Sequence, residues 1–230
     1  ARALEQQQEQ LSTYAELSFE ERLSLLLGCE LQGREKVGVA RLKRQAKLRL
    51  SASSGQLIYK ESRGLNRRQI SELLTGTYLN KHQNILSTGP TGAGKTYLGC
   101  AIGEQACNQQ YSVRYSRLSR LLDELAAGRL DGTFQKQLTT LAKKDLLILD
   151  DWGMEKLSGE QSNHLLELLE DRYQTSSTIM VSQLPVSDWY SMIGNATVAD
   201  AILDRLIHNS HRIELSGESM RKLEQTGQLK

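Results

Sequence analysis

The chain has 230 residues, of which 39% are hydrophobic and 24% charged, as in ordinary globular proteins. Its apolar runs, such as 146–149, fall far short of the ~20 residues that cross a bilayer, so we expect no membrane partner. Three cysteines without metal-like spacing, and no signal-like N-terminus, favour a cytoplasmic protein over a secreted one.

The N-terminal part of the chain is helical and basic. Residues 4–27 have helical spacing in two pieces, and Ser18 and Glu21 have the spacing of a capping box. Residues 34–49 predict a basic amphipathic helix, and 51–55 break the pattern as a linker. Residues 30–68 hold 11 Lys or Arg and three Asp or Glu, so this segment carries +8 while the remainder carries −6. Such a positive segment indicates a polyanionic partner, with a solvated surface as the alternative.

From residue 70 onward, short apolar runs alternate with helical periods, which predicts an α/β fold with a parallel sheet covered by helices. The predicted strands are 84–88, 112–115, 145–150, 178–182 and 212–215. The predicted helices are 95–108, 117–126, 133–142, 160–172 and 197–208.

A glycine-rich loop follows the first of these strands and opens the first helix. Its sequence, Gly-Pro-Thr-Gly-Ala-Gly-Lys-Thr, is that of a P-loop in its required strand–loop–helix setting. The glycines let backbone N–H groups surround a β-phosphate, the lysine reaches the β- and γ-phosphates, and the threonine hydroxyl binds Mg²⁺. This predicts ATP and Mg²⁺ as cofactors. The expected nucleotide-binding residues are Gly89, Pro90, Thr91, Gly92, Ala93, Gly94, Lys95, Thr96 and Tyr97.

Polar residues also follow the next two buried strands. The run 146–149 ends in Asp150 and Asp151, and we expect Asp150 to hold Mg²⁺ and Asp151 to activate the attacking water; the alternative is that one of them caps the following turn. Gln183 follows the run 178–181 and is expected to position that water, or is an ordinary loop amide. Arg205 lies among apolar helix positions, where a salt bridge is the simplest explanation.

Taken together, these residues resemble the initiator and helicase-loader branch of the AAA+ ATPases, and in particular the IstB-like proteins that accompany bacterial insertion-sequence transposases. The resemblance runs from about 19 to 220. It is carried by LSFEERLSLLLGCELQGRE, LLILDDWGMEKLS, TIMVSQLPVSDWY and DAILDRLIHNSHRIELSGESMR, in addition to the P-loop. Asp151 stands where AAA+ proteins usually have Glu, and Gln183 where Asn is commoner, so we expect slow or partner-stimulated hydrolysis.

The resemblance implies a five-stranded parallel sheet in which 178–182 lies between the P-loop strand and 145–150. It implies sensor roles for Gln183 and Arg221, and an arginine finger at Arg205 that acts on ATP bound by a neighbouring subunit. The expected divisions are an N-terminal helical region at 1–52, an AAA+ domain at 53–222 and a tail at 223–230, with no C-terminal lid domain. The implied function is that of a homo-oligomer that binds duplex DNA and assists a cognate transposase; the alternative is a DnaC-like helicase loader.

This branch carries an extra helix before the Asp-Asp strand, and residues 117–143 leave room for it. Basic residues there and in 34–49 form the predicted DNA contact, chiefly to phosphates. The alternative is pairing with neighbouring acids such as Asp123, Glu124 and Asp131. The candidate DNA-binding residues are Arg41, Lys43, Arg44, Lys47, Arg117, Arg120, Arg129 and Lys136.

Overall fold

We describe the fold from a computed structural model, which covers residues 2–14, 16–59, 63–217 and 219–220. The chain divides into two compact units, Ala1–Arg41 and Leu42–Lys230. None of the helices within the described ranges is long and apolar enough to cross a membrane.

The first unit is helical. Helix α1 spans Arg2–Glu9, α2 spans Leu11–Tyr14, and α3 begins at Phe19 and continues to Ala46. The predicted capping box starts α3, because the Ser18 hydroxyl accepts the Glu21 N–H at 3.2 Å and the Glu21 carboxylate accepts the Ser18 N–H at 2.7 Å. The sequence predicted separate helical segments here, whereas α3 runs without a break through 28–33.

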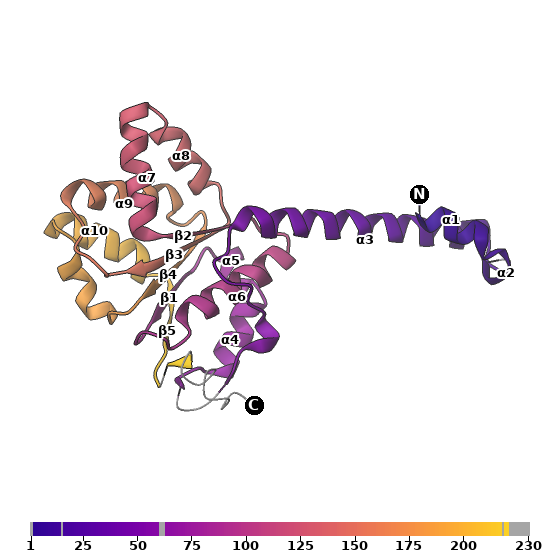
Figure 1. The fold of residues 1–230 in the computed structure, drawn as a ribbon, viewed down its shortest axis with the longest axis horizontal. Coiled ribbons are helices and arrows are strands. Elements are labelled where there is room, and N and C mark those ends of the chain that lie inside the picture. The colour runs from indigo at the N-terminus through magenta and orange to yellow at the C-terminus, as the bar shows by residue number, and fades with distance from the viewer. Residues whose placement is uncertain (1, 15, 60–62, 218, 221–230) are drawn as a thin grey trace. The chain divides into compact units, whose positions relative to one another are not determined.

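The second unit is built on the predicted five-stranded parallel sheet (Figure 1). The strands are β1 (Asn84–Thr88), β2 (Val113–Arg117), β3 (Leu146–Trp152), β4 (Ser177–Ser182) and β5 (Ser210–Glu214). Their order is β2-β3-β4-β1-β5, and every pairing is parallel. The expected position of β4 between the P-loop strand and β3 is therefore confirmed.

Helices cover both faces of this sheet. The elements that complete the unit are η1 (Ser54–Gln56), α4 (Arg67–Leu74), α5 (Thr77–Asn80), α6 (Lys95–Asn108), α7 (Leu118–Asp131), α8 (Phe134–Ala142), α9 (Gly159–Arg172), η3 (Val186–Met192) and α10 (Ala196–Ile207). Figure 1 shows α4 and α6 on one side of the strands and α9 and α10 on the other, with α7 and α8 forming a projecting hairpin. The predicted room for an extra helix at 117–143 is thus filled by α7 and α8.

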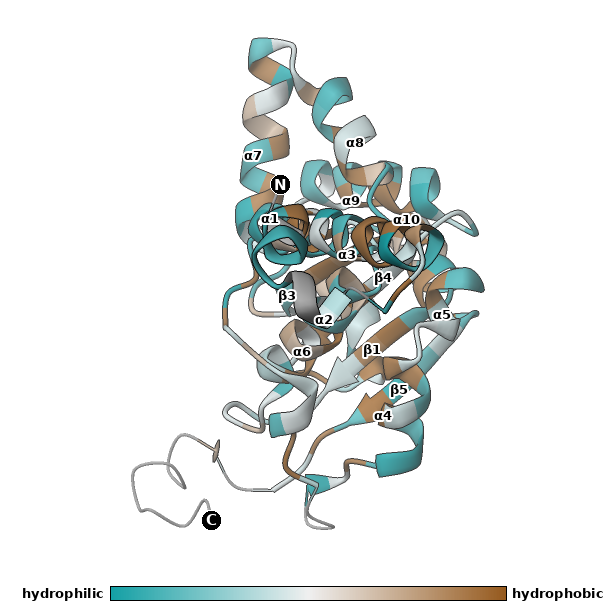
Figure 2. Ribbon diagram, turned by 90° about the vertical axis from the view of Figure 1, so that its right-hand side faces the viewer, coloured by the Kyte–Doolittle hydropathy of each residue, from teal (hydrophilic) through white to brown (hydrophobic). Residues whose placement is uncertain are grey.

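Each face of the sheet has its own hydrophobic core, because successive side chains on a strand point to opposite faces. Ile85, Ile148 and Ile179 pack with α4 and α6, whereas Leu86 and Met180 pack with α7 to α10. The hydrophobic colour along β1 in Figure 2 reflects a strand that is buried from both sides. This buried sheet fixes the loops at its edges, where the polar side chains lie.

Candidate nucleotide-binding site

The P-loop connects β1 to α6 at the carboxyl edge of the sheet, with a backbone that requires glycine. Gly89, Gly92 and Gly94 have φ angles of 139°, 85° and 91°. A Cβ atom at Gly94 would lie 2.8 Å from Nη2 of Arg63, and one at Gly89 would overlap the backbone of Leu215. The loop can therefore curl tightly against its neighbours and direct its N–H groups inward.

Lys95, the first residue of α6, is folded into this loop. Its ammonium group donates to the carbonyl oxygens of Gly89 at 2.7 Å and Pro90 at 2.8 Å, and the residue is 7% exposed. Burial lowers the pKa of Lys95, while the charges of Asp150 and Asp151 oppose that shift. In the part of the chain that the structure describes, no carboxylate pairs with this buried cation, and phosphate oxygens are suitable partners for it.

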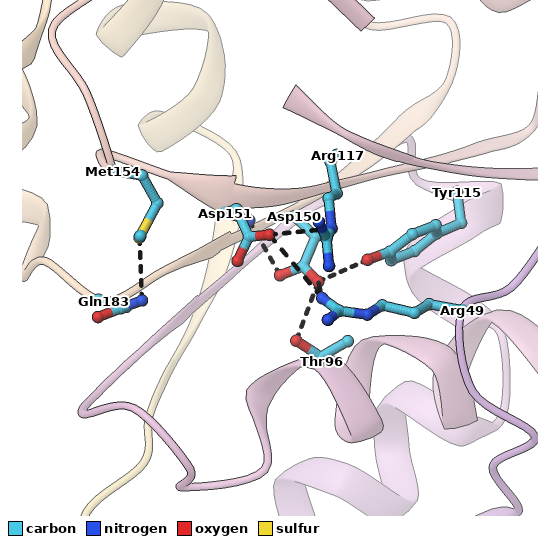
Figure 3. A network of polar contacts seen from close by, with 8 residues as sticks. All are labelled: Arg49, Thr96, Tyr115, Arg117, Asp150, Asp151, Met154 and Gln183. Atoms are coloured by element: carbon cyan, nitrogen blue, oxygen red, sulfur yellow. Dashed lines mark hydrogen bonds and ion pairs between the residues drawn. The ribbon is translucent and has the colours of Figure 1, made fainter. Parts of the chain in front are cut away.

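Asp150 is a buried residue of β3 that lies directly beside Thr96. Its Oδ2 atom accepts the Thr96 hydroxyl at 2.9 Å and the Tyr115 hydroxyl at 2.6 Å, and its Oδ1 atom accepts the Asp151 N–H at 3.0 Å (Figure 3). The hydroxyl and the carboxylate offer the hard oxygen ligands that Mg²⁺ prefers. Among the residues that the structure describes, no three His, Cys, Asp or Glu side chains form a metal cluster. A few protein oxygens that leave the remaining positions to water and substrate phosphates suit Mg²⁺ in a phosphoryl-transfer site.

Asp151 lies at an irregularity in the sheet, where the pairing of β3 with β4 shifts register between Leu149 and Trp152. Its φ angle is 66°, in the left-handed region that Asp tolerates better than most residues. The side chain is one-third exposed, and its Oδ2 atom lies 3.3 Å from Nε of Arg117. At this irregularity the side chain of Asp151 is partly exposed, whereas that of Asp150 is buried.

Gln183 follows β4 and reaches the P-loop. Its Oε1 atom accepts the Thr91 hydroxyl at 2.7 Å. Its Nε2 atom lies 3.0 Å from the sulfur of Met154 (Figure 3). The structure therefore brings the predicted residues of β1, β3 and β4 to one edge of the sheet, as parallel strands require.

Beside the P-loop is a cavity of about 550 Å³ that the sequence did not predict. Leu50, Leu57, Ile58 and Tyr97 contribute to its wall, and Arg63 lies in it with only 8% of its surface exposed. Arg63 donates to the carbonyls of Ile58 at 2.6 Å and Ala93 at 2.9 Å, while burial lowers its pKa. An apolar wall with a few polar groups suits a purine ring. No motif distinguishes Arg63 from the other basic residues of 30–68, so pattern alone could not have found it.

Arg205 lies at the opposite edge of the sheet. Its backbone oxygen accepts the side-chain N–H of Asn84, the first residue of β1, at 3.0 Å. Its guanidinium donates to Glu170 and to the Ala201 carbonyl, both at 2.8 Å. A five-residue strand spans about 17 Å, so Arg205 lies far from the P-loop of its own chain.

Several of the predicted DNA contacts have partners within the chain. Lys43 donates to Glu104 at 2.8 Å, and Arg120 pairs with Glu124 at 3.1 Å. The remaining exposed candidates are Arg41, Arg44, Lys47 and Lys136, while Arg129 pairs with Glu167 at 2.6 Å and stacks on Phe134. Arg221 lies outside the described residues.

Comparison with known proteins identifies the family. The model of the IstB-like ATP binding protein family matches residues 1–227. The chain belongs to this family. It is also 48% identical over 207 residues to a putative insertion sequence ATP-binding protein of Sinorhizobium fredii, covering 90% of this chain and 84% of that protein.

Solved structures share the AAA+ fold with this IstB-like chain. The DnaC helicase loader superposes with a TM-score of 0.59 at 22% identity, covering 74% of this chain and 100% of that one. AMPPCP-bound DnaA from Aquifex aeolicus superposes with a TM-score of 0.65 at 19% identity, covering 80% and 56% respectively. The chain is thus an ATP-binding AAA+ P-loop protein of the insertion-sequence type.

Proposed function

We propose that this IstB-like protein is a Mg²⁺-dependent ATPase that oligomerises on duplex DNA and assists the transposase of its insertion sequence in selecting or activating a target. The relatives' description as insertion sequence ATP-binding proteins favours this role over helicase loading. The similarity to the DnaC helicase loader concerns the fold alone.

The observation that carries the ATPase proposal is the contact between Thr96 and Asp150, which joins the P-loop to β3 within reach of Asp151. In this proposal Lys95 leaves the loop carbonyls and binds the β- and γ-phosphates, while Thr96 and Asp150 hold the metal. When bound, Mg²⁺ neutralises charge on the phosphate oxygens.

Asp151 then accepts a proton from the water that attacks the γ-phosphorus, and Gln183 orients that water. The bond from the γ-phosphorus to the bridging oxygen breaks, which releases ADP and inorganic phosphate. Gln183 is suited to this task because its contact with Thr91 already holds it against the P-loop.

The test separates nucleotide binding from turnover. Lys95→Ala removes the charge that faces the phosphates, so we expect it to abolish tight binding of a fluorescent ATP analogue. Asp151→Asn keeps the shape and the tolerance of a positive φ but removes the basic oxygen, so we expect normal binding and loss of phosphate release.

Both variants are compared with the parent by thermal unfolding, so that misfolding is recognised. Normal nucleotide affinity in folded Lys95→Ala protein would refute the P-loop assignment. Unchanged hydrolysis by Asp151→Asn would assign the base to another residue.

A further inference from the structure

Arg49 faces the carboxylate of Asp150, the proposed metal ligand, and that of Asp151, the proposed base, although it comes from a part of the chain that precedes the P-loop. Its Nη1 atom lies 3.7 Å from Oδ2 of Asp150 and 3.8 Å from Oδ2 of Asp151. Figure 3 shows the guanidinium pointing between Thr96 and the two carboxylates. No P-loop or strand-end motif includes this position, which lies three residues after the end of α3.

Local packing holds the segment around Arg49 in place. Helix α3 ends at Ala46 because Lys47 takes a φ angle of 50°, which turns the chain toward α6. Leu48 packs against α6 where Gly103 lacks a side chain, and a Cβ at Gly103 would lie 3.2 Å from Cδ2 of Leu48. The buried thiol of Cys100 interacts with the backbone of Arg49. The position of Arg49 is therefore set by the fold of the second unit, Leu42–Lys230.

The charge of Arg49 is matched to its surroundings. A guanidinium is always protonated in proteins, so Arg49 carries a full positive charge beside the two aspartates. Asp150 is 1% exposed, so a nearby cation interacts with it more strongly than it would with a surface carboxylate. Arg49 thus supplies positive charge at the place where a metal ion is expected.

We propose that Arg49 is a positioning residue that supplies positive charge beside Asp150 and Asp151 until Mg²⁺ binds at Thr96 and Asp150. This inference rests on the proposed ATPase function. Mg²⁺ would be held in part by the Asp150 carboxylate, so the metal and the guanidinium would compete for the same negative charge. Two cations this close also repel each other, and Arg49 must move away from Asp150 when the metal enters.

The competition has a measurable consequence. A neutral side chain at position 49 removes the competing charge, so the site should bind a divalent cation more tightly. Because the Arg49 side chain is 36% exposed, we expect a gain of roughly three- to tenfold rather than the larger effect of a fully buried pair. Arg49→Lys keeps a positive charge but loses the planar guanidinium that faces two carboxylates. The affinity of this variant for the divalent cation should therefore lie between those of the parent and Arg49→Gln.

The experiment titrates the full-length chain with Mn²⁺ in the presence of a non-hydrolysable ATP analogue, and follows free Mn²⁺ by electron paramagnetic resonance. It compares the parent, Arg49→Gln, Arg49→Lys and the matched control Arg68→Gln. Arg68 is exposed and belongs to the same basic segment, so its substitution makes the same change in net charge away from the site. We expect tighter Mn²⁺ binding in Arg49→Gln and parent-like binding in Arg68→Gln.

The parent and Lys95→Ala separate the two ways in which this experiment can fail. If the parent takes up no more nucleotide-dependent Mn²⁺ than Lys95→Ala does, the proposed function itself is wrong. If the parent binds Mn²⁺ but Arg49→Gln binds it equally or more weakly, only the role of Arg49 is overturned. Thermal unfolding of each variant confirms that the comparison is between folded proteins. Equal gains in Mn²⁺ affinity in Arg49→Gln and Arg68→Gln would also overturn the proposed competition between Arg49 and the metal.

Discussion

The carboxylate of Asp150 lies in a pocket where hydroxyl groups are its nearest donors. Thr96 and Tyr115 both donate to Oδ2, and burial disfavours the ionised form of Tyr115, whose pKa is raised by desolvation and by its contact with Asp150. The tyrosine therefore stays protonated and remains a donor. A donor that orients a metal-binding carboxylate affects metal affinity even though it does not bind the metal.

We predict that Tyr115→Phe weakens nucleotide-dependent Mn²⁺ binding by roughly tenfold, because Asp150 loses the hydrogen bond that orients it. The matched control is Tyr111→Phe, which removes a hydroxyl that donates to Asn80 at 2.8 Å away from the site. The same Mn²⁺ titration measures both. Equal losses of Mn²⁺ affinity in the two variants would indicate a general loss of stability. An unchanged Mn²⁺ affinity in Tyr115→Phe would show that Thr96 alone suffices to orient Asp150.

Candidate residues can be named from the sequence where the chemistry depends on neighbours in sequence. Lys95 and Thr96 belong to one motif, and Asp150 ends one apolar run, so spacing alone makes them candidates. Tyr115 and Arg49 escaped prediction because their nearness to Asp150 depends on tertiary packing. Tyr115 reaches it only because β2 pairs with β3 in a register that places Arg117 opposite Asp150. The positive φ of Asp151 likewise follows from the bulge between β3 and β4 and has no signal in its own sequence.

At the scale of elements, the basic part of α3 divides into paired and exposed charges. Lys43 is held by Glu104 of α6, whereas Arg41, Arg44 and Lys47 are exposed. Arg41 and Arg44 are three residues apart, so they lie on the same side of the helix. The predicted DNA contact of this segment therefore rests on Arg41 and Arg44 of α3 and on Lys47 just after it, and Lys43 serves packing against α6.

We predict that replacing Arg41, Arg44 and Lys47 together by Ala weakens duplex binding in ATP and flattens its dependence on salt, because fewer phosphate charges are neutralised. The measurement is a salt titration of duplex affinity with ATP, with ADP and without nucleotide. A control that replaces the exposed residues Arg68, Lys81 and Lys156 makes the same change in net charge elsewhere. An unchanged salt slope would remove this part of α3 from the DNA site.

Helices and strands could be predicted where their burial produces a simple pattern of apolar residues in the sequence. Strands buried on both faces, such as β3 and β4, appear as continuous apolar runs, and all five strands were placed. Helices α4 and α5 were missed because they are eight and four residues long, too short to establish a period. The end of α3 was predicted three residues late, because Lys47 terminates it without the glycine that normally signals a helix end.

On the scale of the whole molecule, the two edges of the sheet carry different parts of the proposed reaction. Lys95, Asp150 and Gln183 lie at the carboxyl edge, while Arg205 lies at the amino edge beside Asn84. Within one chain Arg205 cannot approach the phosphates held by the P-loop. If it takes part in hydrolysis, it must act on nucleotide bound by another copy, which would make assembly a condition for activity.

The contact between Arg205 and Glu170 supplies a control for that role. If Arg205 serves only as a structural ion pair, loss of either partner should destabilise the fold to a similar extent and leave hydrolysis intact. If it acts in trans, Arg205→Ala should lower the hydrolysis rate ~10³-fold or more with ATP still bound, whereas Glu170→Ala should keep hydrolysis.

The decisive measurement uses assemblies in which Arg205→Ala and Lys95→Ala subunits are mixed. An Arg205→Ala subunit keeps its P-loop, and a Lys95→Ala subunit keeps its arginine, so an interface between the two can pair an intact P-loop with an intact finger. We predict that each variant alone is inactive and that mixtures recover part of the phosphate release, with a maximum near equal proportions because mixed interfaces are then most frequent. If no mixture releases phosphate faster than the two separate variants, Arg205 has only a structural role and another residue supplies the catalytic positive charge.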